Sequence, residues 1–460
     1  IRRPPRSTLF PYTTLFDLKT FHIHTFGCQM NVLDSEKAAG LLVAAGWQKA
    51  ARPQEADLIL YNTCCVREKP VQKVYSYLGQ TLALKAKRPD LRVGLMGCVA
   101  QQQGGAIMRA FAGLDLILGT RKIHRLISHL ADLEAGRVER CVDIDMDDDP
   151  LPVEVDTILR ETSFRAFVTI MEGCDNFCAY CVVPHTRGRE RSRPSSRILD
   201  EVRRLVNEGA VEIMLLGQNV NSYRDPAGSV PEFADLLAEV AAVPGLKRLR
   251  FTTSHPKDFH ERLFWVMLEY PVICNQLHLP AQSGSTRILA AMNRRYTSED
   301  YLAKVDMIRR SGRHISLSSD FIVGFPDESE QDFEDTLSLL RHVRYDSIFS
   351  FMYSPRPGTS AFDQPDSVPR AVKRERLVRL QAAQEAIQLE NNRGEIGSIR
   401  DVLVDGRGRE AGQLASRTTE NKIVHFAGEP ILVGRFRRVR VTGASAHSLR
   451  GELVPQPAGG

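Results

Sequence analysis

The chain has 460 residues, of which 43% are hydrophobic and 25% charged, and a prior of about 150 residues per domain suggests roughly three ordinary globular domains. This composition excludes a disordered, a collagen-like or a small disulfide-stapled protein, and the apolar runs are far shorter than the ~20 residues of a membrane helix. The net charge of +5 is too small to indicate a nucleic-acid partner by itself. Nine cysteines, an odd number without a secretion signal, indicate reduced thiols or metal ligands in a cytoplasmic protein.

Residues 1–16 are rich in Arg, Pro and Thr and show no apolar period. They are not a signal peptide, because no apolar stretch of adequate length follows the arginines. The segment resembles the translated remnant of a sequencing adapter, and a natural disordered extension is the alternative. We therefore expect a non-native tail at 1–16 and ordered structure from about Lys19.

An N-terminal domain over 19–136 is predicted from alternating strand and helix patterns. Strands are expected at Phe21–Phe26, Asp57–Asn62, Arg92–Met96 and Leu114–Leu118. Helices are expected between and after them, at Asp34–Ala45, Val71–Ala86, Ala100–Phe111 and Lys122–Leu133. This alternation predicts βαβ units and an open, mostly parallel α/β sheet.

Three cysteines of this domain occupy corresponding positions. Cys28, Cys64 and Cys98 each fall just past the carboxyl end of a predicted strand, about one βα unit apart. Ligands of open α/β sheets bind at that edge, so the fold could bring all three together. Their spacing alone also fits buried free cysteines, which are common.

The acidic, Pro-containing segment over 137–160 is predicted to be a solvated linker. A second βα series follows over 161–390. Its strands are expected at Phe164–Ile170, Val211–Leu216, Lys247–Thr252, Ile273–Leu279, Ile315–Val323 and Ser347–Met352. Six such units are too few for a complete eight-stranded barrel, so we expect a partial, open (βα)6 barrel. A charged helix at about Arg370–Asn391 leads into the last segment.

Residues 391–455 change character. Short β-rich pieces are separated by Gly and polar turns, at Ile399–Val404, Gly412–Ser416, Lys422–Phe426 and Phe436–Thr442. They predict a small β-barrel. Eleven Lys and Arg stand against seven Asp and Glu here, so this segment holds most of the chain's excess positive charge. A basic β-barrel suits RNA, and a merely solvated surface is the alternative.

The strongest motif is Cys174-Asp-Asn-Phe-Cys178-Ala-Tyr-Cys181, directly after the first strand of the second series. Thiolates are the usual ligands of iron–sulfur clusters. Three cysteines this close can hold three irons of a [4Fe–4S] cube and leave the fourth iron open to another ligand. A zinc site with a distant fourth ligand is the alternative, although the spacing differs from that of zinc fingers.

This CxxxCxxC motif resembles that of the radical S-adenosylmethionine (SAM) family, whose usual fold is a partial βα barrel. Short sequence segments around the other cysteines resemble the N-terminal domain of the methylthiotransferases: Thr25-Phe-Gly-Cys28-Gln-Met-Asn31, Asn62-Thr-Cys64-Cys65-Val-Arg67 and Met96-Gly-Cys98. The C-terminal segment resembles a TRAM domain. Within that family, two segments favour the MiaB-type tRNA methylthiotransferases: Gly217-Gln-Asn-Val-Asn-Ser-Tyr223 and Phe251-Thr-Thr-Ser-His-Pro256.

The resemblance implies two [4Fe–4S] clusters, one on Cys174, Cys178 and Cys181 and an auxiliary one on Cys28, Cys64 and Cys98. It implies methylthiolation of C2 of N6-isopentenyladenosine at position 37 of tRNA. One SAM would donate the methyl group and a second would yield the 5′-deoxyadenosyl radical. The same chemistry on a threonylcarbamoyl-adenosine of tRNA or on a ribosomal-protein aspartate is the alternative. The non-enzymatic alternative is an iron–sulfur protein that binds RNA as a regulator and catalyses no reaction.

Side chains at the carboxyl ends of barrel strands face a bound cofactor in such folds. We therefore expect SAM contacts, or support of the SAM loop, from Gln218, Asn219, Ser254, Gln282, Arg295 and Gly324; Asn221, His255, Ser283 and Arg294 are further candidates. Turn capping or a surface position is the alternative for each. Arginines expected to bind RNA phosphates are Arg187, Arg189, Arg191, Arg437, Arg438 and Arg440. Expected partners are the tRNA anticodon stem-loop and a flavodoxin or ferredoxin reductant, with no membrane and a monomeric state.

Overall fold

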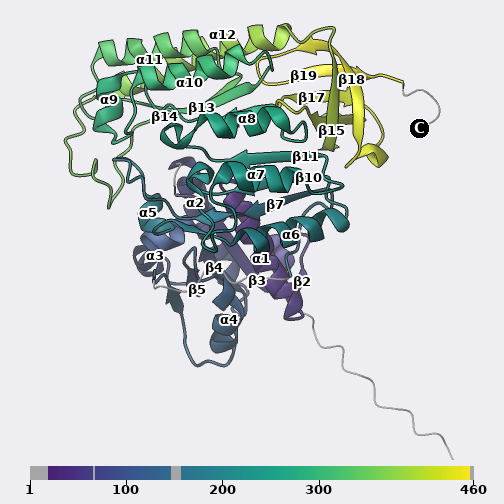
Figure 1. Ribbon diagram of the computed structural model, residues 1–460. Helices are drawn as coiled ribbons and strands as arrows, with labels where there is room; N and C mark the ends of the chain where they lie inside the picture. The colour runs from purple at the N-terminus through teal and green to yellow at the C-terminus, as the bar shows by residue number, and fades with distance from the viewer. Residues whose placement is uncertain (1–18, 66–67, 147–156, 456–460) are drawn as a thin grey trace, which may run out of the picture. The chain divides into compact units, whose positions relative to one another are not determined.

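The computed structural model describes residues 19–65, 68–146 and 157–455 (Figure 1). The expected tail at 1–16 and the centre of the expected acidic linker lie outside these residues. The chain divides into two compact units, residues 1–159 (unit 1) and 160–460 (unit 2), each considered by itself below. Among the described helices, none has both the length and the apolarity that crossing a membrane requires.

Unit 1 is built on one six-stranded sheet in which every pair of neighbours is parallel. The strand order is β2-β1-β3-β4-β5-β6. The strands are β1 (Thr20–Phe26), β2 (Gln48–Lys49), β3 (Leu58–Thr63), β4 (Arg92–Met96), β5 (Leu116–Leu118) and β6 (Cys141–Asp143). The helices are α1 (Gln29–Ala44), α2 (Glu68–Lys85), α3 (Cys98–Ala110) and α4 (Leu126–Glu134), with single 3-10 turns η1 (Pro53–Glu55) and η2 (Ile123–Arg125).

The predicted parallel α/β sheet of unit 1 is confirmed, and two short strands at its edges were not predicted. Strand β6 lies inside the segment expected to be a linker. Its Asp143 is 6% exposed and pairs with Arg125 (3.0 Å) and His129 (2.8 Å), which ties the strand to η2 and α4. The ordered sheet therefore extends past the expected boundary at residue 136, because contacts of the buried Asp143 side chain stabilise a strand too short to show a pattern.

Unit 2 begins with six parallel strands in two three-stranded sheets, β7-β10-β11 and β12-β13-β14, joined by a parallel bridge between Leu249 and Ile273. The strands are β7 (Arg165–Thr169), β10 (Glu212–Leu216), β11 (Arg248–Thr252), β12 (Gln276–His278), β13 (Ser316–Val323) and β14 (Ser347–Met352). The predicted open (βα)6 barrel, called the open barrel below, is thus confirmed. Only β12 is much shorter than expected, and the small hairpin of β8 (Met171–Glu172) and β9 (Arg191–Ser192) was not predicted.

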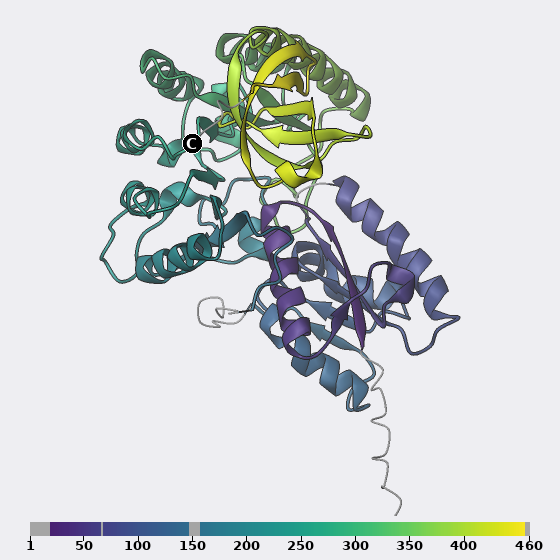
Figure 2. The same cartoon turned by 90° about the vertical axis from the view of Figure 1, so that its right-hand side faces the viewer.

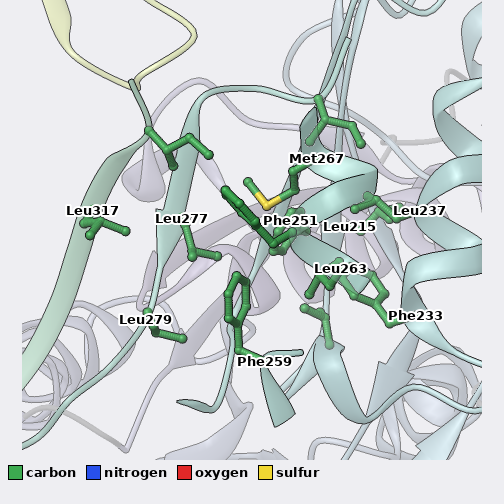
Figure 3. Close-up of a cluster of buried hydrophobic side chains, with 14 of the residues drawn as sticks. Leu215, Phe233, Leu237, Phe251, Phe259, Leu263, Met267, Leu277, Leu279 and Leu317 are labelled. Atoms are coloured by element: carbon green, nitrogen blue, oxygen red, sulfur yellow. The ribbon is translucent and has the colours of Figure 1, made fainter. Parts of the chain in front are cut away.

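Helices cover the outer face of the open barrel (Figures 1 and 2). They include α6 (Ser195–Asn207), α7 (Phe233–Ala241), α8 (Glu261–Glu269), α10 (Ser298–Arg310), α11 (Glu330–Val343) and α12 (Arg370–Arg393). The remaining helices of this part are the short α5 (Val183–Thr186), directly after the CxxxCxxC loop, and α9 (Thr286–Ala291), with 3-10 turns η3 (Val220–Ser222) and η4 (Pro256–Asp258). Figure 3 shows apolar side chains of strands and helices meeting in this layer, among them Leu215, Phe251, Leu237 and Met267. Because side chains alternate along a strand, the residues between them point to the interior of the barrel.

The C-terminal segment forms a closed five-stranded barrel in the order β15-β16-β17-β19-β18, called the C-terminal barrel below (Figure 2). The strands are β15 (Ile399–Arg407), β16 (Gln413–Arg417), β17 (Ile423–Ala427), β18 (Phe436–Ala444) and β19 (Leu449–Leu453), with the turn η5 (Pro430–Leu432). Alternate residues such as Val402, Val424 and Val439 fill its core. The predicted small β-barrel is confirmed, and β19 is the strand that was not expected.

Candidate metal centres

The CxxxCxxC loop of unit 2 lies between β8 and α5 and is closely packed where it begins. Gly173 has a φ of +79°, and a Cβ at this position would lie 2.1 Å from the carbonyl oxygen of Arg189. The backbone N–H of Cys174 donates a hydrogen bond of 3.2 Å to the carbonyl of Gly188. Only glycine permits both this backbone angle and this approach, so Gly173 fixes where the first cysteine stands.

Two of the three thiols of this loop, those of Cys174 and Cys181, have pKa values that their surroundings raise. Burial, with a smaller contribution from the neighbouring Cys178, raises the pKa of Cys174 to about 11. Burial also raises the pKa of Cys181 to about 12, with Cys178 again contributing. These thiols stay protonated at neutral pH unless a cation stabilises their thiolates. A crowded set of three thiols therefore suits a positively charged iron centre.

Arg294 connects this loop to the open barrel. It is 4% exposed, and its Nη1 lies 3.4 Å from the Sγ of Cys178 and 3.3 Å from the hydroxyl of Tyr180. Its Nη2 donates to the carbonyl of Pro280 (2.8 Å), and its Nε donates to the hydroxyl of Tyr296 (3.0 Å). A buried guanidinium beside a cysteine offsets the negative charge that three thiolates bring to the site.

His255 faces the same cysteine from the end of β11. Its Nε2 lies 3.9 Å from the Sγ of Cys178, and its Nδ1 accepts a hydrogen bond of 3.2 Å from the backbone N–H of Lys257. Burial, followed by the charges of Arg294 and Lys257, lowers the pKa of His255. The ring is therefore neutral at physiological pH, and its remaining proton is on Nε2, directed toward the sulfur.

Gln218 and Asn219 hold loops of the site in place. The Oε1 of Gln218 accepts a hydrogen bond of 2.6 Å from the backbone N–H of Gly173. The Oδ1 of Asn219 accepts from the backbone N–H of His255 (3.1 Å), and its Nδ2 donates to Asp258 (2.7 Å). We expected these side chains either to contact SAM or to support its loop, and the contacts that they make support loops.

Three polar side chains near the carboxyl ends of barrel strands bury atoms without a hydrogen-bond partner among the described residues. They are the hydroxyls of Thr169 and Ser254 and the amide of Asn221. Thr169 and Ser254 are each only 3% exposed. A buried polar atom costs free energy unless a partner satisfies it. The amino, carboxylate and hydroxyl groups of SAM are partners of the required kind, so this end of the barrel fits that molecule.

The remaining expected cofactor contacts have different surroundings. Gln282 is buried, with a φ of +72°, and its backbone is bonded to β13. Arg295 is exposed, whereas the neighbouring Arg294 reaches the cysteine loop. Gly324 has a φ of +70°, and a Cβ there would lie 2.3 Å from the Cγ of Lys373. Close packing against Lys373 explains this glycine without a ligand.

The three cysteines of unit 1 follow the neighbouring strands β1, β3 and β4, as the alternation predicted. Cys28 caps the start of α1, and Cys98 is the first residue of α3. Cys64 donates its backbone N–H to the carbonyl of Phe26, 2.8 Å away. Cys64 and Cys98 are buried, and Cys28 is exposed. The carboxyl edge of the sheet therefore brings the three cysteine-bearing loops side by side.

A buried pair of asparagines joins these loops. The Nδ2 of Asn31 donates to the Oδ1 of Asn62 (2.9 Å), and the Nδ2 of Asn62 donates to the backbone carbonyl of Asn31 (2.8 Å). A Cβ on Gly97 would lie 2.2 Å from the Oδ1 of Asn62, and one on Gly27 would lie 2.4 Å from the Oδ1 of Asn31. The two glycines thus let the chain close tightly over the pair.

Neither asparagine was predicted as a site residue, although both lie in the sequence segments around Cys28 and Cys64. Among the described residues, no three Cys, His, Asp or Glu side chains already have the arrangement of a metal site. The backbone brings the cysteine-bearing loops of unit 1 to one edge of its sheet, and the three cysteines of unit 2 stand within a single loop. Six soft sulfur donors in two sets of three, without a carboxylate among them, suit iron–sulfur clusters.

The arginines expected to bind RNA fall into two groups. Arg187 is 4% exposed, which differs from the surface position that we expected, and Arg191 and Arg437 are half-buried. The side chain of Arg189 is 72% exposed and pairs with Asp175 at 2.7 Å. Arg438 and Arg440 are exposed on β18, with the buried Val439 between them. Arg189, Arg438 and Arg440 are the members placed where a phosphate could reach them.

Family models match three parts of the chain: the radical SAM superfamily over residues 168–340, the uncharacterized protein family UPF0004 over 20–119, and the TRAM domain over 393–454. Among solved structures, the fold resembles the radical SAM methyltransferase TsrM from Kitasatospora setae. The structure with tryptophan and a SAM analogue bound has a TM-score of 0.55 and 14% identity over 75% of each chain. The structure with cobalamin and a [4Fe–4S] cluster has a TM-score of 0.52 and 15% identity over 75% of this chain and 74% of the other.

Curated relatives match almost the whole chain. The protein of Syntrophotalea carbinolica named tRNA-2-methylthio-N(6)-dimethylallyladenosine synthase is 46% identical to this chain, over 95% of this chain and 100% of the relative. The corresponding protein of Solibacter usitatus is 47% identical over 94% and 98%, and that of Moorella thermoacetica is 47% identical over 95% and 98%. The chain therefore belongs to the tRNA-2-methylthio-N(6)-dimethylallyladenosine synthases, a family of radical SAM methylthiotransferases.

Proposed function

We propose that this chain attaches a methylthio group to C2 of N6-isopentenyladenosine at position 37 of tRNA. It would consume two SAM molecules, one as methyl donor and one for reductive cleavage. The observation that carries this function is the pair of three-cysteine sets. Each set lies at the carboxyl ends of parallel strands, one in unit 1 and one in unit 2. A reaction that both activates a C–H bond and inserts sulfur needs two such centres.

In unit 2, we assign Cys174, Cys178 and Cys181 as ligands of the cluster that binds SAM. When bound, this cluster would supply the electron that cleaves SAM, and the cluster of unit 1 would supply a place for the sulfur. Arg294 would offset thiolate charge at Cys178, and Ser254 would donate a hydrogen bond to SAM. Buried apolar side chains beside the cysteine loop, among them Met292 and Phe325, would help to exclude water from the reacting atoms.

In unit 1, we assign Cys28, Cys64 and Cys98 as the ligands of the auxiliary cluster. The Asn31–Asn62 pair, which is fully buried, would keep the three loops in register when the cluster is absent. The exposure of Cys28 supports an open side of this site, where a substrate could approach. Iron loading of unit 1 should therefore depend on the two asparagines as well as on the cysteines.

The partners follow from the same chemistry. We infer that Arg189, Arg438 and Arg440 contact phosphates of the anticodon stem-loop, because these exposed side chains can reach them. SAM cleavage consumes an electron that no side chain supplies, so a carrier such as flavodoxin or ferredoxin would deliver it. A tRNA substrate supports a cytoplasmic location, and we expect the chain to act as a monomer.

Single cysteine variants test the division of labour between the two sets. After anaerobic reconstitution, Cys178→Ser and Cys64→Ser should each lose about half of the bound iron. Cys178→Ser should form no 5′-deoxyadenosine from SAM, whereas Cys64→Ser should still form it but produce no methylthiolated nucleoside. Cys141→Ser, outside both sets, is the control and should match the wild type. Zinc in place of iron, or methylthiolation by Cys64→Ser, would contradict the assignment.

A further inference from the structure

Two buried arginines of the open barrel face the C-terminal barrel. Arg248 and Arg250 stand near the amino end of β11, and each is 3% exposed. The intervening Leu249 and the following Phe251 belong to the apolar layer under the helices. Strand alternation therefore turns both guanidinium groups to the interior of the barrel, at the end opposite the CxxxCxxC loop.

Both arginines donate hydrogen bonds to backbone carbonyls of the C-terminal barrel. Arg248 makes two such bonds, of 2.7 and 2.8 Å, and Arg250 makes two, of 2.7 and 3.1 Å. The four acceptors are the carbonyls of Asp401, Arg417, Thr418 and Thr419. Three of these acceptors belong to the end of β16 and the turn after it, so the arginines hold that turn against the mouth of the open barrel.

Ion pairs join the same surfaces. Glu212 of β10 is 1% exposed and contacts Arg250 at 3.0 Å and Arg165 at 2.7 Å. Arg165 in turn contacts Asp405 of β15, which also pairs with Arg417 at 2.9 Å. The chain of charges runs from the interior of one barrel to the wall of the other. Charge-assisted hydrogen bonds of this kind are stronger than neutral ones and fix orientation.

The turn between β16 and β17 is shaped for this contact. Asn421 has a φ of +66°, and the N–H of Thr418 donates to the carbonyl of Lys422 at 3.0 Å, which makes the turn compact. Glu420 of this turn is 7% exposed and accepts a hydrogen bond of 3.1 Å from Asn275, which precedes β12. The contact therefore extends from β11 to the neighbouring strand.

We propose that Arg248 and Arg250 are positioning residues for RNA. They lock the C-terminal barrel onto the amino-terminal end of the open barrel, so that Arg438 and Arg440 on β18 keep a fixed position relative to the CxxxCxxC loop. Because the acceptors are backbone carbonyls, the lock leaves the side chains of the RNA-binding face free. The RNA part of this inference rests on the proposed function, and the lock itself does not.

Arg248→Met is the direct test, because it removes two contacts and leaves Glu212 paired with Arg250 and Arg165. In the full-length protein, hydrogen exchange of the amides at 399–407 and 413–427 should become faster, with β13 and β14 unchanged. The KM for tRNA should rise, by about tenfold where the loosened C-terminal barrel costs tRNA binding one charged phosphate contact. SAM cleavage without tRNA should keep its rate.

Arg309→Met is the matched control, because Arg309 also donates to two carbonyls, of Ile315 and Val343, but both belong to the open barrel. It should change neither exchange in the C-terminal barrel nor the KM for tRNA. If Arg248→Met does not fold, Arg248→Lys should show smaller changes in the same direction. Unchanged exchange would overturn the lock, and faster exchange with an unchanged KM would overturn the positioning role. The exchange measurement needs no RNA, so it stands even if the proposed reaction fails.

Discussion

At the scale of single residues, the site contains buried polar groups of two kinds, those with several hydrogen-bond partners and those with none among the described residues. Arg294 makes four contacts: its donors reach a thiol, two tyrosine hydroxyls and a backbone carbonyl. Ser254 is the opposite case, because its buried hydroxyl has no partner among the described residues. The first arrangement stabilises the unliganded loop, and the second reserves binding energy for a ligand.

Arg294→Met should therefore destabilise unit 2 on the order of 3 kcal/mol, because it removes a buried charge with several hydrogen bonds. Iron binding by the CxxxCxxC loop should fall as well, since Cys178 and Tyr180 lose their common partner. Urea unfolding and iron analysis measure the two effects. Arg295→Met is the control and should change both by little. Equal effects of the two substitutions would contradict the role given to Arg294.

Ser254→Ala should have the opposite effect on stability in the absence of SAM. Removing an unsatisfied buried hydroxyl should leave stability unchanged or raise it by up to ~1 kcal/mol. The affinity for SAM should nevertheless fall roughly tenfold, as the loss of one hydrogen bond to a charged ligand gives. Thermal unfolding and equilibrium binding separate the two. Ser285→Ala, which removes the N-cap of α9, should instead destabilise the protein by ~1 kcal/mol. Unchanged SAM affinity in Ser254→Ala would show that this hydroxyl has another purpose.

At the scale of elements, glycines at the starts of helices let the cysteine loops approach one another. Gly97 precedes α3 with a φ of +90°, and its missing Cβ leaves room for Asn62. Gly105 lies within α3, and a Cβ there would meet nothing closer than 3.7 Å. Substitution by alanine just before this helix and within it should thus have two different physical consequences.

Gly97→Ala should destabilise unit 1 by roughly 1–3 kcal/mol, through left-handed backbone strain and the clash with Asn62. It should also lower iron loading of Cys28, Cys64 and Cys98. Gly105→Ala should stabilise the helix by ~0.5–1 kcal/mol, because alanine is the better helix former. Denaturant unfolding of the two variants measures whether the free energy of unfolding falls in the first and rises in the second. A harmless Gly97→Ala would refute the close packing of these loops.

The elements that carry function could be predicted from sequence, and those fixed by tertiary contacts could not. The alternation of strands and helices predicted the parallel sheet of unit 1 and the open barrel of unit 2, and the CxxxCxxC motif indicated the cysteine set of unit 2. Strand β6 is only three residues long and depends on the contacts of Asp143 with Arg125 and His129. The choice of Arg294 over Arg295 depends on which guanidinium the backbone turns inward. No periodicity in the sequence distinguishes two adjacent arginines.

At the scale of the whole molecule, charges buried between the two barrels of unit 2 determine its response to acid. Burial alone would raise the pKa of Glu212, but Arg250 and Arg165 outweigh it and hold that pKa below its usual range. Burial lowers the pKa of Arg248, which has backbone carbonyls and the ring of Phe436 around it. The junction therefore needs Glu212 ionised.

A carboxyl group whose folded pKa is lowered stabilises the fold above its unfolded pKa and loses this effect as pH falls through the folded value. Wild-type stability should thus include a contribution that disappears below about pH 4.5. Glu212→Gln should be less stable by roughly 3 kcal/mol at pH 7, because it leaves buried arginines unpaired. The difference between the two proteins should shrink toward pH 3.5 in urea unfolding. Parallel curves across this range would contradict the ionised state of Glu212.

The central claim is that this chain methylthiolates isopentenylated tRNA, and a mass spectrum of the product nucleosides tests it most directly. Anaerobically reconstituted protein receives dithionite, SAM and tRNA, with or without the isopentenyl group on adenosine 37. The account predicts one added methylthio group on isopentenyladenosine alone, together with 5′-deoxyadenosine. If 5′-deoxyadenosine forms while the isopentenyladenosine stays unmodified, or if neither product forms from iron-loaded protein, the proposed function is wrong.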